Sequence, residues 1–366
     1  MIDARWRSLR KLLLVRLDNL GDVLLMTPAF HALKIAFPQA QLTLLTSPVG
    51  AQVGQLDPDI DEVIVYEAPW IDPWQQLPQE STREQAMIAL LREKCFDAAI
   101  IFTSFRQSSL PAALLCYLAD IPLRLAASLD GSGSLLTTRH KHPERMMHEV
   151  ERGFDLISAI GVEPAGQALI LQVPYEAQQA IQDFLSHKHS DGRPLIVLHP
   201  GCSMPARTYS WEQYAEVVTQ LAKQTQALIT LTGGKNEEEL IARILQRVHP
   251  TARAQTLVGA FSFAQFCALI QRADLVITNN TGPMHIAAAL KTPVIALFAL
   301  TNPPEQWKPW GVAHRLLYHD VPCRLCYSRV CPYQHECLSL VSPQMVVDAA
   351  RAFLVSTAEH MQEVRQ

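Results

Sequence analysis

The chain has 366 residues, of which 49% are hydrophobic and 18% are charged, and its formal net charge at pH 7 is −4. A chain of this length exceeds one ordinary hydrophobic core, so two α/β domains of common size are expected. The composition excludes a disordered protein. The slight negative charge, without a zinc-finger or RNA-binding signature, argues against a nucleic-acid partner.

The first half of the chain alternates predicted strands with predicted helices. The apolar run 11–16 is typical of a buried strand, a short loop ends at Gly21, and a helix is predicted over 22–37. Strands that alternate with helices in this way indicate a parallel sheet. The further strands of this half are predicted at 41–46, 63–66 and 98–102.

The second half repeats the plan of the first. Predicted helices at 148–160 and 177–188 lead to a new start at Arg193, which places the domain boundary between about 165 and 190. A helix is also predicted at 211–224. The strands of this half are predicted at 195–199, 228–232, 275–278 and 294–298.

We therefore divide the chain into residues 1–175, 176–345 and a last segment, 346–366. Two open parallel sheets in tandem leave a cleft that faces the carboxyl ends of both sets of strands, where such sheets bind ligands. The loops that follow the strands are the places to search for binding residues.

The clearest binding signal is the loop that follows the predicted strand 275–278. It reads Asn-Asn-Thr-Gly-Pro-Met-His and opens a helix. Unpaired backbone N–H groups and the helix dipole at such a start suit a diphosphate, and Thr281 and Gly282 permit close approach. Plain capping by Asn280 or Thr281, with Pro283 in the first turn, is the common alternative.

Three other loops of the same half carry polar groups in comparable positions. Arg207 follows the strand that ends at His199, Glu237 follows Gly234, and Thr301 follows the last predicted strand. A guanidinium binds phosphate through its planar fork, and a carboxylate accepts hydrogen bonds from ribose hydroxyls. Together the loops predict one nucleotide-binding site.

These motifs resemble, in order and spacing, those of glycosyltransferase family 9, the ADP-heptose:lipopolysaccharide heptosyltransferases. The resemblance covers nearly the whole chain and implies an α/β fold of two Rossmann-like domains with parallel sheets facing a central cleft (GT-B). It implies a nucleotide-sugar donor in the C-terminal half and an acceptor in the N-terminal half. It further implies inversion at the anomeric carbon without a catalytic metal. The supporting stretches are 16–28, 199–201, 232–234 and 281–290.

The resemblance also implies roles for single residues. The general base of the family is the acidic residue of a Gly-Asp pair, which is Asp22 here, and Asp18 is a second carboxylate that could take this role. An inverting transfer needs such a carboxylate on the acceptor side, whereas a helix-capping Asp is the alternative from the residues alone. The expected donor-binding residues are Arg207, Glu237, Asn280, Thr281, Gly282, Pro283, Met284 and His285.

Asn280 is a departure from the family pattern, in which the residue before Thr-Gly is commonly Asp. An amide can bond a sugar hydroxyl but carries no negative charge, so donor identity and even activity stay open at this residue. Acceptors in the family often carry phosphate or carboxylate groups. The basic residues expected to bind them are Arg106, Arg124, Lys141 and Arg145.

Four of the eight cysteines lie within fifteen residues, at Cys323, Cys326, Cys331 and Cys337. Four thiols at this spacing can hold a structural zinc or iron ion. The alternative for a cytoplasmic protein is that the four thiols are reduced and bind no metal. Similar clusters occur in many members of the family that the chain resembles, including members without known metal, and in protein heptosyltransferases a related cluster holds iron. No cofactor is expected for catalysis itself.

The apolar run near the start is too short for a secretory signal, and no run has the length of a transmembrane helix. We therefore expect a cytoplasmic protein. The basic residues at the start of the chain could touch an anionic membrane surface at the inner face, although an ordinary solvated start is favoured. A final helix from Pro343 is expected to cross back to the first domain, as in the family.

The function expected from the resemblance is transfer of a heptose from ADP-heptose to a lipopolysaccharide inner-core acceptor. The alternatives are another nucleotide sugar, a protein or other surface glycan as acceptor, or a sugar-nucleotide-binding protein without catalysis. An NAD-dependent oxidoreductase is disfavoured because no Gly-x-Gly-x-x-Gly follows the first predicted strand.

Overall fold

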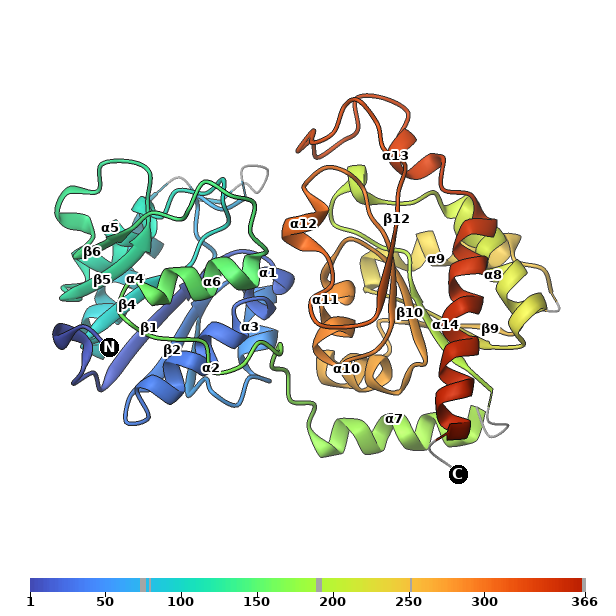
Figure 1. Ribbon diagram of the computed structural model, residues 1–366, viewed down its shortest axis with the longest axis horizontal. Coiled ribbons are helices and arrows are strands. Elements are labelled where there is room, and N and C mark those ends of the chain that lie inside the picture. Colours follow the sequence, from blue (N-terminus) through green and yellow to red (C-terminus); the bar gives the residue numbers. More distant parts are fainter. Residues whose placement is uncertain (73–76, 79, 189–192, 251, 364–366) are drawn as a thin grey trace. The chain divides into compact units, whose positions relative to one another are not determined.

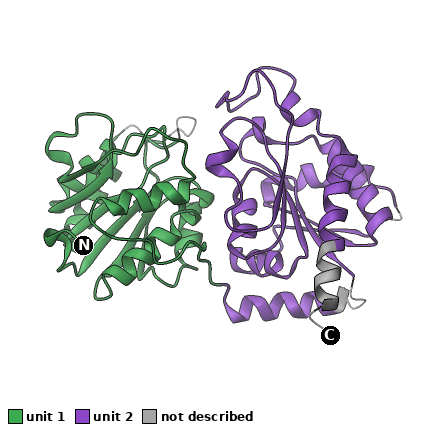
Figure 2. Ribbon diagram, viewed as in Figure 1, with its two compact units in different colours: residues 1–172 green, residues 173–366 purple. Residues whose placement is uncertain are grey.

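The computed structural model describes residues 1–72, 77–78, 80–188, 193–250 and 252–363. The chain forms two compact units, residues 1–172 and 173–366 (Figure 2), and the boundary predicted from the sequence lies at 175. Among the described helices, none is both long enough and apolar enough to pass through a membrane.

The first unit is built on one parallel sheet of six strands in the order β3-β2-β1-β4-β5-β6 (Figure 1). This is the Rossmann strand order, which changes direction between β1 and β4. The predicted parallel sheet of this half is therefore confirmed. The strands are β1 (Lys11–Arg16), β2 (Gln41–Thr46), β3 (Glu62–Val65), β4 (Ala98–Ile101), β5 (Leu123–Ala127) and β6 (Thr138–His140).

Helices cover both faces of this sheet. Val15 and Ile101 of the sheet pack against Leu91 of α4 and Ala113 of α5, and α6 packs on α2 over the other face (Figure 1). The helices are α1 (Leu20–Leu24), α2 (Thr27–Ala36), α3 (Pro48–Gly54), α4 (Thr82–Lys94), α5 (Leu110–Leu118) and α6 (Glu149–Ser158).

The single helix predicted over 22–37 is two helices, α1 and α2. Pro28 lies in the first turn of α2, where its missing N–H and its ring are tolerated. A continuous helix would place that ring against the carbonyl of Leu24. The break instead lets Thr27 Oγ1 donate to the oxygen of Leu24 at 2.8 Å.

The second unit has the same topology, with the strand order β12-β11-β10-β7-β8-β9 and a change of direction between β7 and β10. The fold class predicted for the chain, two Rossmann-like domains with parallel sheets, is confirmed. The strands are β7 (Leu195–His199), β8 (Leu228–Gly233), β9 (Ala254–Val258), β10 (Leu275–Asn279), β11 (Val294–Leu297) and β12 (His314–Leu317).

The strands that the sequence analysis missed lie at or next to the sheet edges. They are β5, β6, β9 and β12. Each is short, and polar residues interrupt the apolar run that marks the central strands. Edge strands of a parallel sheet are less buried, so their sequences carry a weaker apolar signal.

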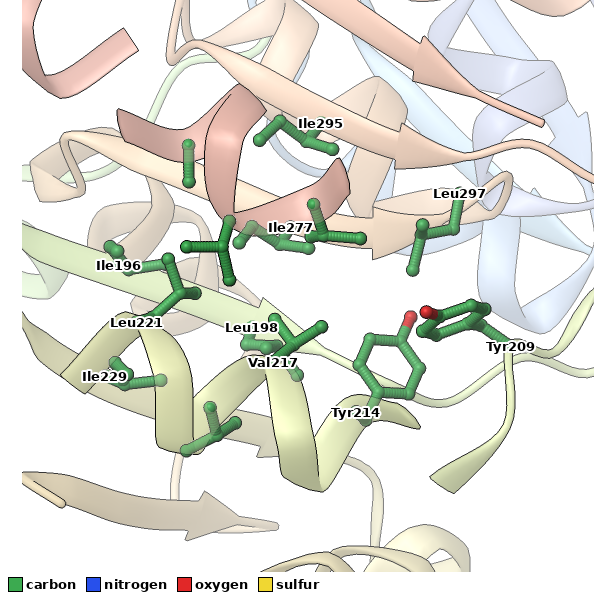
Figure 3. Packing of buried hydrophobic residues seen from close by; sticks show 14 of the residues in the cluster. Ile196, Leu198, Tyr209, Tyr214, Val217, Leu221, Ile229, Ile277, Ile295 and Leu297 are labelled. Atoms are coloured by element: carbon green, nitrogen blue, oxygen red, sulfur yellow. The ribbon is translucent and has the colours of Figure 1, made fainter. Parts of the chain in front are cut away.

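The core of the second unit lies between the sheet and a layer formed by α8, α9 and α14. Figure 3 shows Val217 and Leu221 of α8 directed toward Ile196, Ile229 and Ile277 of the strands. The main helices are α7 (Tyr175–Lys188), α8 (Trp211–Thr225), α9 (Glu238–Arg247), α10 (Phe263–Arg272), α11 (Gly282–Ala289) and α14 (Pro343–Glu363), with short helices α12 (Pro304–Trp307) and α13 (Glu336–Ser339).

The C-terminal helix α14 belongs to this layer. Val346, Val347 and Ala350 are fully buried in the same core as α8. The sequence analysis set 346–366 apart as a segment that crosses to the first domain. In the structure the apolar face of α14 completes the core of the second unit, where it packs along α8, and the crossing to the first domain stays a prediction.

Candidate active site

Polar side chains gather in the first unit where the strand order changes direction, which is where open α/β sheets bind ligands. Asp18 follows β1, and Ser104 follows β4, the strand beside it. Ser104 Oγ donates to Asp18 Oδ2 at 3.1 Å, and Arg16 Nη2 donates to Ser104 Oγ at 2.9 Å. A polar network around Arg16 therefore joins the two strand ends.

The guanidinium of Arg16 is fully buried among three carboxylates. Its Nη2 lies 3.1 Å from Asp18 Oδ2, 3.2 Å from Asp22 Oδ1 and 3.5 Å from Glu149 Oε2. Val15 packs under α4 and α5, so Arg16, one residue further along β1, projects to the opposite face of the sheet. That face is covered by α6, which begins at Glu149.

Burial and charge set the protonation of this cluster. Burial raises the pKa of Asp18 to about 6, although Arg16 lowers it and the carboxylate of Asp22 raises it further. Burial acts to lower the pKa of Arg16, but the surrounding carboxylates outweigh it and the pKa is raised. Arg16 therefore stays charged, while Asp18 titrates close to neutral pH.

Asp22 is the third residue of α1 and caps the start of that helix. Its Oδ2 accepts hydrogen bonds from the backbone N–H of Asn19 at 3.0 Å and from Asn19 Nδ2 at 3.3 Å. Its Oδ1 accepts from Arg16 Nη2, and the side chain is 10% exposed. Because each carboxylate oxygen has two lone pairs, these bonds still permit Asp22 to accept a proton.

A cavity of about 320 Å³ opens beside the cluster, at the carboxyl ends of β1 and β4. It combines apolar and aromatic walls with a carboxylate and a guanidinium, the mixture that binds polar organic molecules. The residues that line it include Leu17, Asp18, Trp70, Phe102, Arg106 and Gln107. Arg106 is thus the predicted acceptor-binding residue that the structure brings to this cavity.

Arg124 was predicted to bind the acceptor, but its guanidinium contacts backbone carbonyl oxygens of its own unit. Arg124 is buried on β5, and its Nε and Nη2 donate at 2.8 Å to the carbonyl oxygens of Leu135 and Ser134. Its Nη1 donates to the carbonyl of Ile121. The guanidinium therefore holds the connection between β5 and β6 in place of binding a ligand.

Lys141 and Arg145 are surface residues of the segment between β6 and α6. Lys141 Nζ lies 3.2 Å from Glu144 Oε1, and Arg145 Nη1 lies 4.0 Å from Glu151 Oε2. The Lys141 and Arg145 side chains are more than half exposed. Exposed pairs of this kind are weak, so both side chains are available to an anionic partner.

In the second unit Asn279 holds together the loops around the end of β10. The buried Oδ1 of Asn279 accepts hydrogen bonds from the N–H of Tyr209 and the hydroxyl of Tyr214, both at 3.1 Å. Its Nδ2 donates to the oxygen of Pro200 at 2.8 Å. The two tyrosine rings meet edge to face with centroids 5.1 Å apart. Figure 3 shows the rings beside each other at the start of α8. One amide thus fixes the loop after β7 and the start of α8.

The helix after β10, α11, begins at Gly282. Thr281 is its N-cap residue, and within the described residues the Thr281 side chain forms no capping hydrogen bond. Pro283 lies in the first turn, Met284 is fully buried, and His285 is 5% exposed. The capping role considered for Thr281 is therefore not found. Met284 N–H donates to the oxygen of Thr281 at 3.0 Å and Pro283 has no N–H, so the N–H of Gly282 is the first-turn group that could meet an anion.

Asn280 pairs with the backbone of Ala299, just beyond β11. Its Oδ1 accepts from the N–H of Ala299 at 3.2 Å, and its Nδ2 donates to the oxygen of Ala299 at 3.4 Å. An ionised carboxylate could accept the first bond but could not donate the second. The reciprocal pairing gives the Asn280 amide a structural role that an Asp side chain would fill only in part.

We expect Asn280→Asp to lower the free energy of unfolding by about 1–3 kcal/mol, because a buried carboxylate would face the oxygen of Ala299 without a donor. Urea unfolding at neutral pH measures the loss, and acid should restore part of it by protonating the new side chain. Asn302→Asp is the matched control, since Asn302 Oδ1 accepts from Thr301 Oγ1 and a carboxylate keeps that bond. Unchanged stability together with tighter donor binding would instead place the side chain on the donor.

Arg207 and Glu237 lie on the loops that the sequence predicted. Arg207 Nε donates to Thr301 Oγ1 at 3.0 Å, which joins the loops after β7 and β11. Glu237 Oε2 accepts from the N–H of Gly234 at 2.8 Å and lies 3.6 Å from His199 Nε2. Burial lowers the pKa of His199, while Glu237 acts to raise it.

The Glu237 side chain leaves no room for a side chain at residue 201, so this position requires glycine. A Cβ at Gly201 would overlap the Glu237 carboxylate, and a Cβ at Gly233 would meet the same side chain. The two glycine loops therefore let the carboxylate lie against the backbone after β7 and β8. This close approach is the physical reason for the His-Pro-Gly and Thr-Gly-Gly motifs.

The four predicted metal-binding cysteines are free thiols that line one small cavity of about 10 Å³. Burial and the neighbouring thiols raise the pKa of Cys337. In the described part of the chain, the group whose ligand atoms lie within 4.8 Å of one another is a different one and includes no cysteine. The thiols thus converge, but their loop must tighten before they can share an ion.

A model of glycosyltransferase family 9 (heptosyltransferase) matches residues 85–336, which is more than half of the 366 residues. The chain belongs to glycosyltransferase family 9. The predicted family and the predicted enzyme class, a glycosyltransferase, are confirmed.

Relatives of this glycosyltransferase match it over almost its whole length. Lipopolysaccharide heptosyltransferase 2 of Salmonella typhimurium is 26% identical over 358 residues, which cover 94% of this chain and 98% of the relative. The family 9 glycosyltransferase of Veillonella parvula has the same fold, with a TM-score of 0.80, 20% identity and coverage of 95% and 98%. The E. coli ADP-heptose lps heptosyltransferase II has a TM-score of 0.75, 24% identity and coverage of 95% and 99%.

Four residues of the glycosyltransferase site were missed as candidates in the sequence. Arg16 was counted only as one of several basic residues near the start, although an Arg that ends an apolar strand before two aspartates signals a buried ion cluster. Glu149 and Asn279 are buried and act on other site residues, and His199 lies beside Glu237. Such partners come together only through folding, so spacing along the chain does not reveal them.

Proposed function

We propose that this glycosyltransferase moves a heptose from ADP-heptose to a lipopolysaccharide inner-core acceptor, with inversion and without a metal ion in the chemical step. The observation that carries the proposal is the pair of aspartates around buried Arg16, beside a cavity at the change of strand order in the first unit. The names of the Salmonella and E. coli relatives support the donor and acceptor.

The first unit supplies the base in this proposal. Asp22 takes the proton of the attacking hydroxyl, the acceptor oxygen forms a bond to the anomeric carbon, and the bond from that carbon to the diphosphate breaks on the opposite face. ADP leaves with the electron pair of the broken bond. Asp18 is the alternative base, because it lines the cavity and its pKa of about 6 suits proton transfer.

The second unit supplies the donor site. The N–H of Gly282 at the start of α11 and the guanidinium of Arg207 face the charge that grows on the leaving diphosphate in this proposal. Glu237 is held by Gly234 in a position to accept ribose hydroxyls. Positive charge from the protein therefore stabilises the leaving diphosphate, as a metal ion does in other transferases.

A structural zinc or iron ion at Cys323, Cys326, Cys331 and Cys337 remains part of the proposal. Thiolates prefer zinc and iron, and all four side chains line the same small cavity. Such an ion would fix the loop before α13, next to Thr301, and would supply rigidity there. It has no role in the transfer step.

The proposal includes a cytoplasmic site of action, with peripheral contact at the inner face of the membrane where a lipid-linked acceptor is presented. The alternative of a binding protein without catalysis rested on Asn280. The pairing of Asn280 with Ala299 gives this residue a structural role. Asn280 therefore no longer supports the alternative of a binding protein.

Calorimetry with a panel of nucleotide sugars tests the donor. We expect ADP-heptose to bind and ADP to compete, whereas a hexose donor that binds when ADP-heptose does not would overturn the assignment. Transfer to heptose-deficient lipopolysaccharide, followed by NMR of the new glycosidic bond, tests the acceptor and the inversion. Turnover that persists in the presence of a chelator is expected if no metal takes part in the chemistry.

A further inference from the structure

Three metal-ligating side chains meet in the first unit, outside the candidate active site. His140 is the last residue of β6, His142 follows it by two residues, and Asp155 lies on α6. Their ligand atoms all lie within 4.8 Å of one another, the one such group found among the described residues. Asp155 Oδ2 lies 2.6 Å from His140 Nε2 and 2.6 Å from His142 Nδ1.

The backbone directs both imidazoles to the same carboxylate. Residues two apart in an extended segment project from the same side, so His140 and His142 face α6 together. Their rings are nearly perpendicular, at 84°, with centroids 5.1 Å apart. Each ring can therefore present one nitrogen to a shared point without stacking on the other.

The three side chains are accessible but sheltered. The His140, His142 and Asp155 side chains are 17%, 13% and 24% exposed. Partial shelter excludes most water from the ligands while leaving a path for an ion, which an exposed acidic patch does not provide.

The charges around the three side chains only partly favour the binding of a cation. Asp155 brings one negative charge. Arg152 of α6 is near enough to His142 to act on it, but Arg152 Nε lies 3.2 Å from Glu149 Oε1, and that carboxylate offsets its charge. His142, Glu149 and Arg152 also line one small cavity of about 10 Å³. An ion at the trio would thus be linked through α6 to the cluster around Arg16.

We propose that His140, His142 and Asp155 bind a divalent transition-metal ion, with zinc preferred. Two imidazoles and one carboxylate form a ligand set that zinc accepts, and the fourth position would be taken by water. Ligands of a tetrahedral zinc ion lie about 3.3 Å apart, as bond lengths of about 2.0 Å require. A small outward shift of the Asp155 carboxylate is therefore enough to admit the ion.

The bound ion would join the edge strand β6 to α6 and so order the segment 141–148 between them. That segment leads directly into Glu149, whose carboxylate lies 3.5 Å from Arg16. The site is therefore structural, and its effect on the active-site cluster is one of positioning.

The test must separate this site from the four cysteines. The full chain is stripped with a chelator and titrated with Co²⁺, because a nitrogen and oxygen site shows visible d–d bands without the thiolate charge-transfer band of a cysteine site. We expect wild type to show the nitrogen and oxygen signal. His140→Gln and His142→Gln should weaken it at least about tenfold, since even the loss of a residue that only hydrogen-bonds a metal ligand costs this much.

A matched control is His31→Gln, because His31 Nδ1 lies 2.8 Å from Asp59 Oδ2, and among the described residues no group of three ligands includes this pair. This variant should bind Co²⁺ and Zn²⁺ like wild type. Zinc measured by mass spectrometry on the quadruple Cys→Ser variant gives a second readout, with one ion per chain expected. Wild-type protein that shows only the thiolate signal, or equal metal affinity in His142→Gln, would overturn the proposal and leave a hydrogen-bonded trio.

Discussion

Asp22→Asn is expected to lower kcat by about 10²–10⁴-fold while leaving the Kd for the donor unchanged, because the amide keeps the shape of the side chain but cannot take a proton. Donor binding is expected to survive because the proposed donor residues all belong to the second unit. Single-turnover kinetics gives the rate of the chemical step, and calorimetry with ADP gives the affinity.

The capping role of Asp22 requires its own control. Asn19→Ala removes the Nδ2 bond to Asp22 Oδ2 and should disturb the start of α1 while the carboxylate remains. This variant should lose stability with most of its turnover retained. Asp18→Asn completes the set: if it abolishes turnover and Asp22→Asn does not, the base is Asp18, and the wild-type kcat/KM should then fall below about pH 6.

Arg16→Met is expected to lower the free energy of unfolding at neutral pH by about 3–5 kcal/mol, the usual cost of removing one partner from a buried ion cluster. The substitution keeps an unbranched apolar stem but removes the guanidinium, which leaves the carboxylates of Asp18, Asp22 and Glu149 around an apolar group. Denaturant unfolding measures the loss. Arg92→Met is the control, because Arg92 pairs with Asp120 on the surface, where both side chains are more than half exposed, and little change is expected.

The cost of Arg16→Met should depend on pH in a defined direction. The pKa of Asp18 is raised from its ordinary value of 3.8 to about 6 in the folded protein, so the folded state holds this proton more tightly than the unfolded state. The contribution of Asp18 to stability is therefore favourable in acid and is lost as the pH rises from about 4 to about 6.

Loss of Arg16 removes the cation that lowers the pKa of Asp18, so in the variant that pKa should rise further. The difference in stability between wild type and Arg16→Met should then be smaller near pH 4, where Asp18 is protonated in both folded proteins, and should grow through pH 6. A difference that does not change with pH would show that the loss comes from packing and not from charge.

Local sequence patterns were sufficient for the central strands and for the loops that carry the site. The apolar runs of β1, β7 and β10 are continuous because both faces of a parallel sheet are buried, so the strands were found without tertiary information. The Gly-Asp pair at Asp22 and the Thr-Gly-Pro run at Thr281 follow those strands within a few residues. In each Rossmann sheet such a loop lies at the carboxyl ends of the strands, which is why short motifs were enough to predict candidate binding loops.

Only the tertiary structure decided which polar groups surround those motifs. Glu149 meets Arg16 across 133 positions of the chain (149 minus 16), and Asn280 meets Ala299 across 19. The environment that raises the pKa of Asp18 exists only when α6 covers β1, and the pairing that selects Asn at 280 exists only when β11 lies beside β10. Burial and partner geometry are properties of the packed chain, whereas periodicity is a property of each segment, and this difference separates what the sequence alone determined from what required the fold.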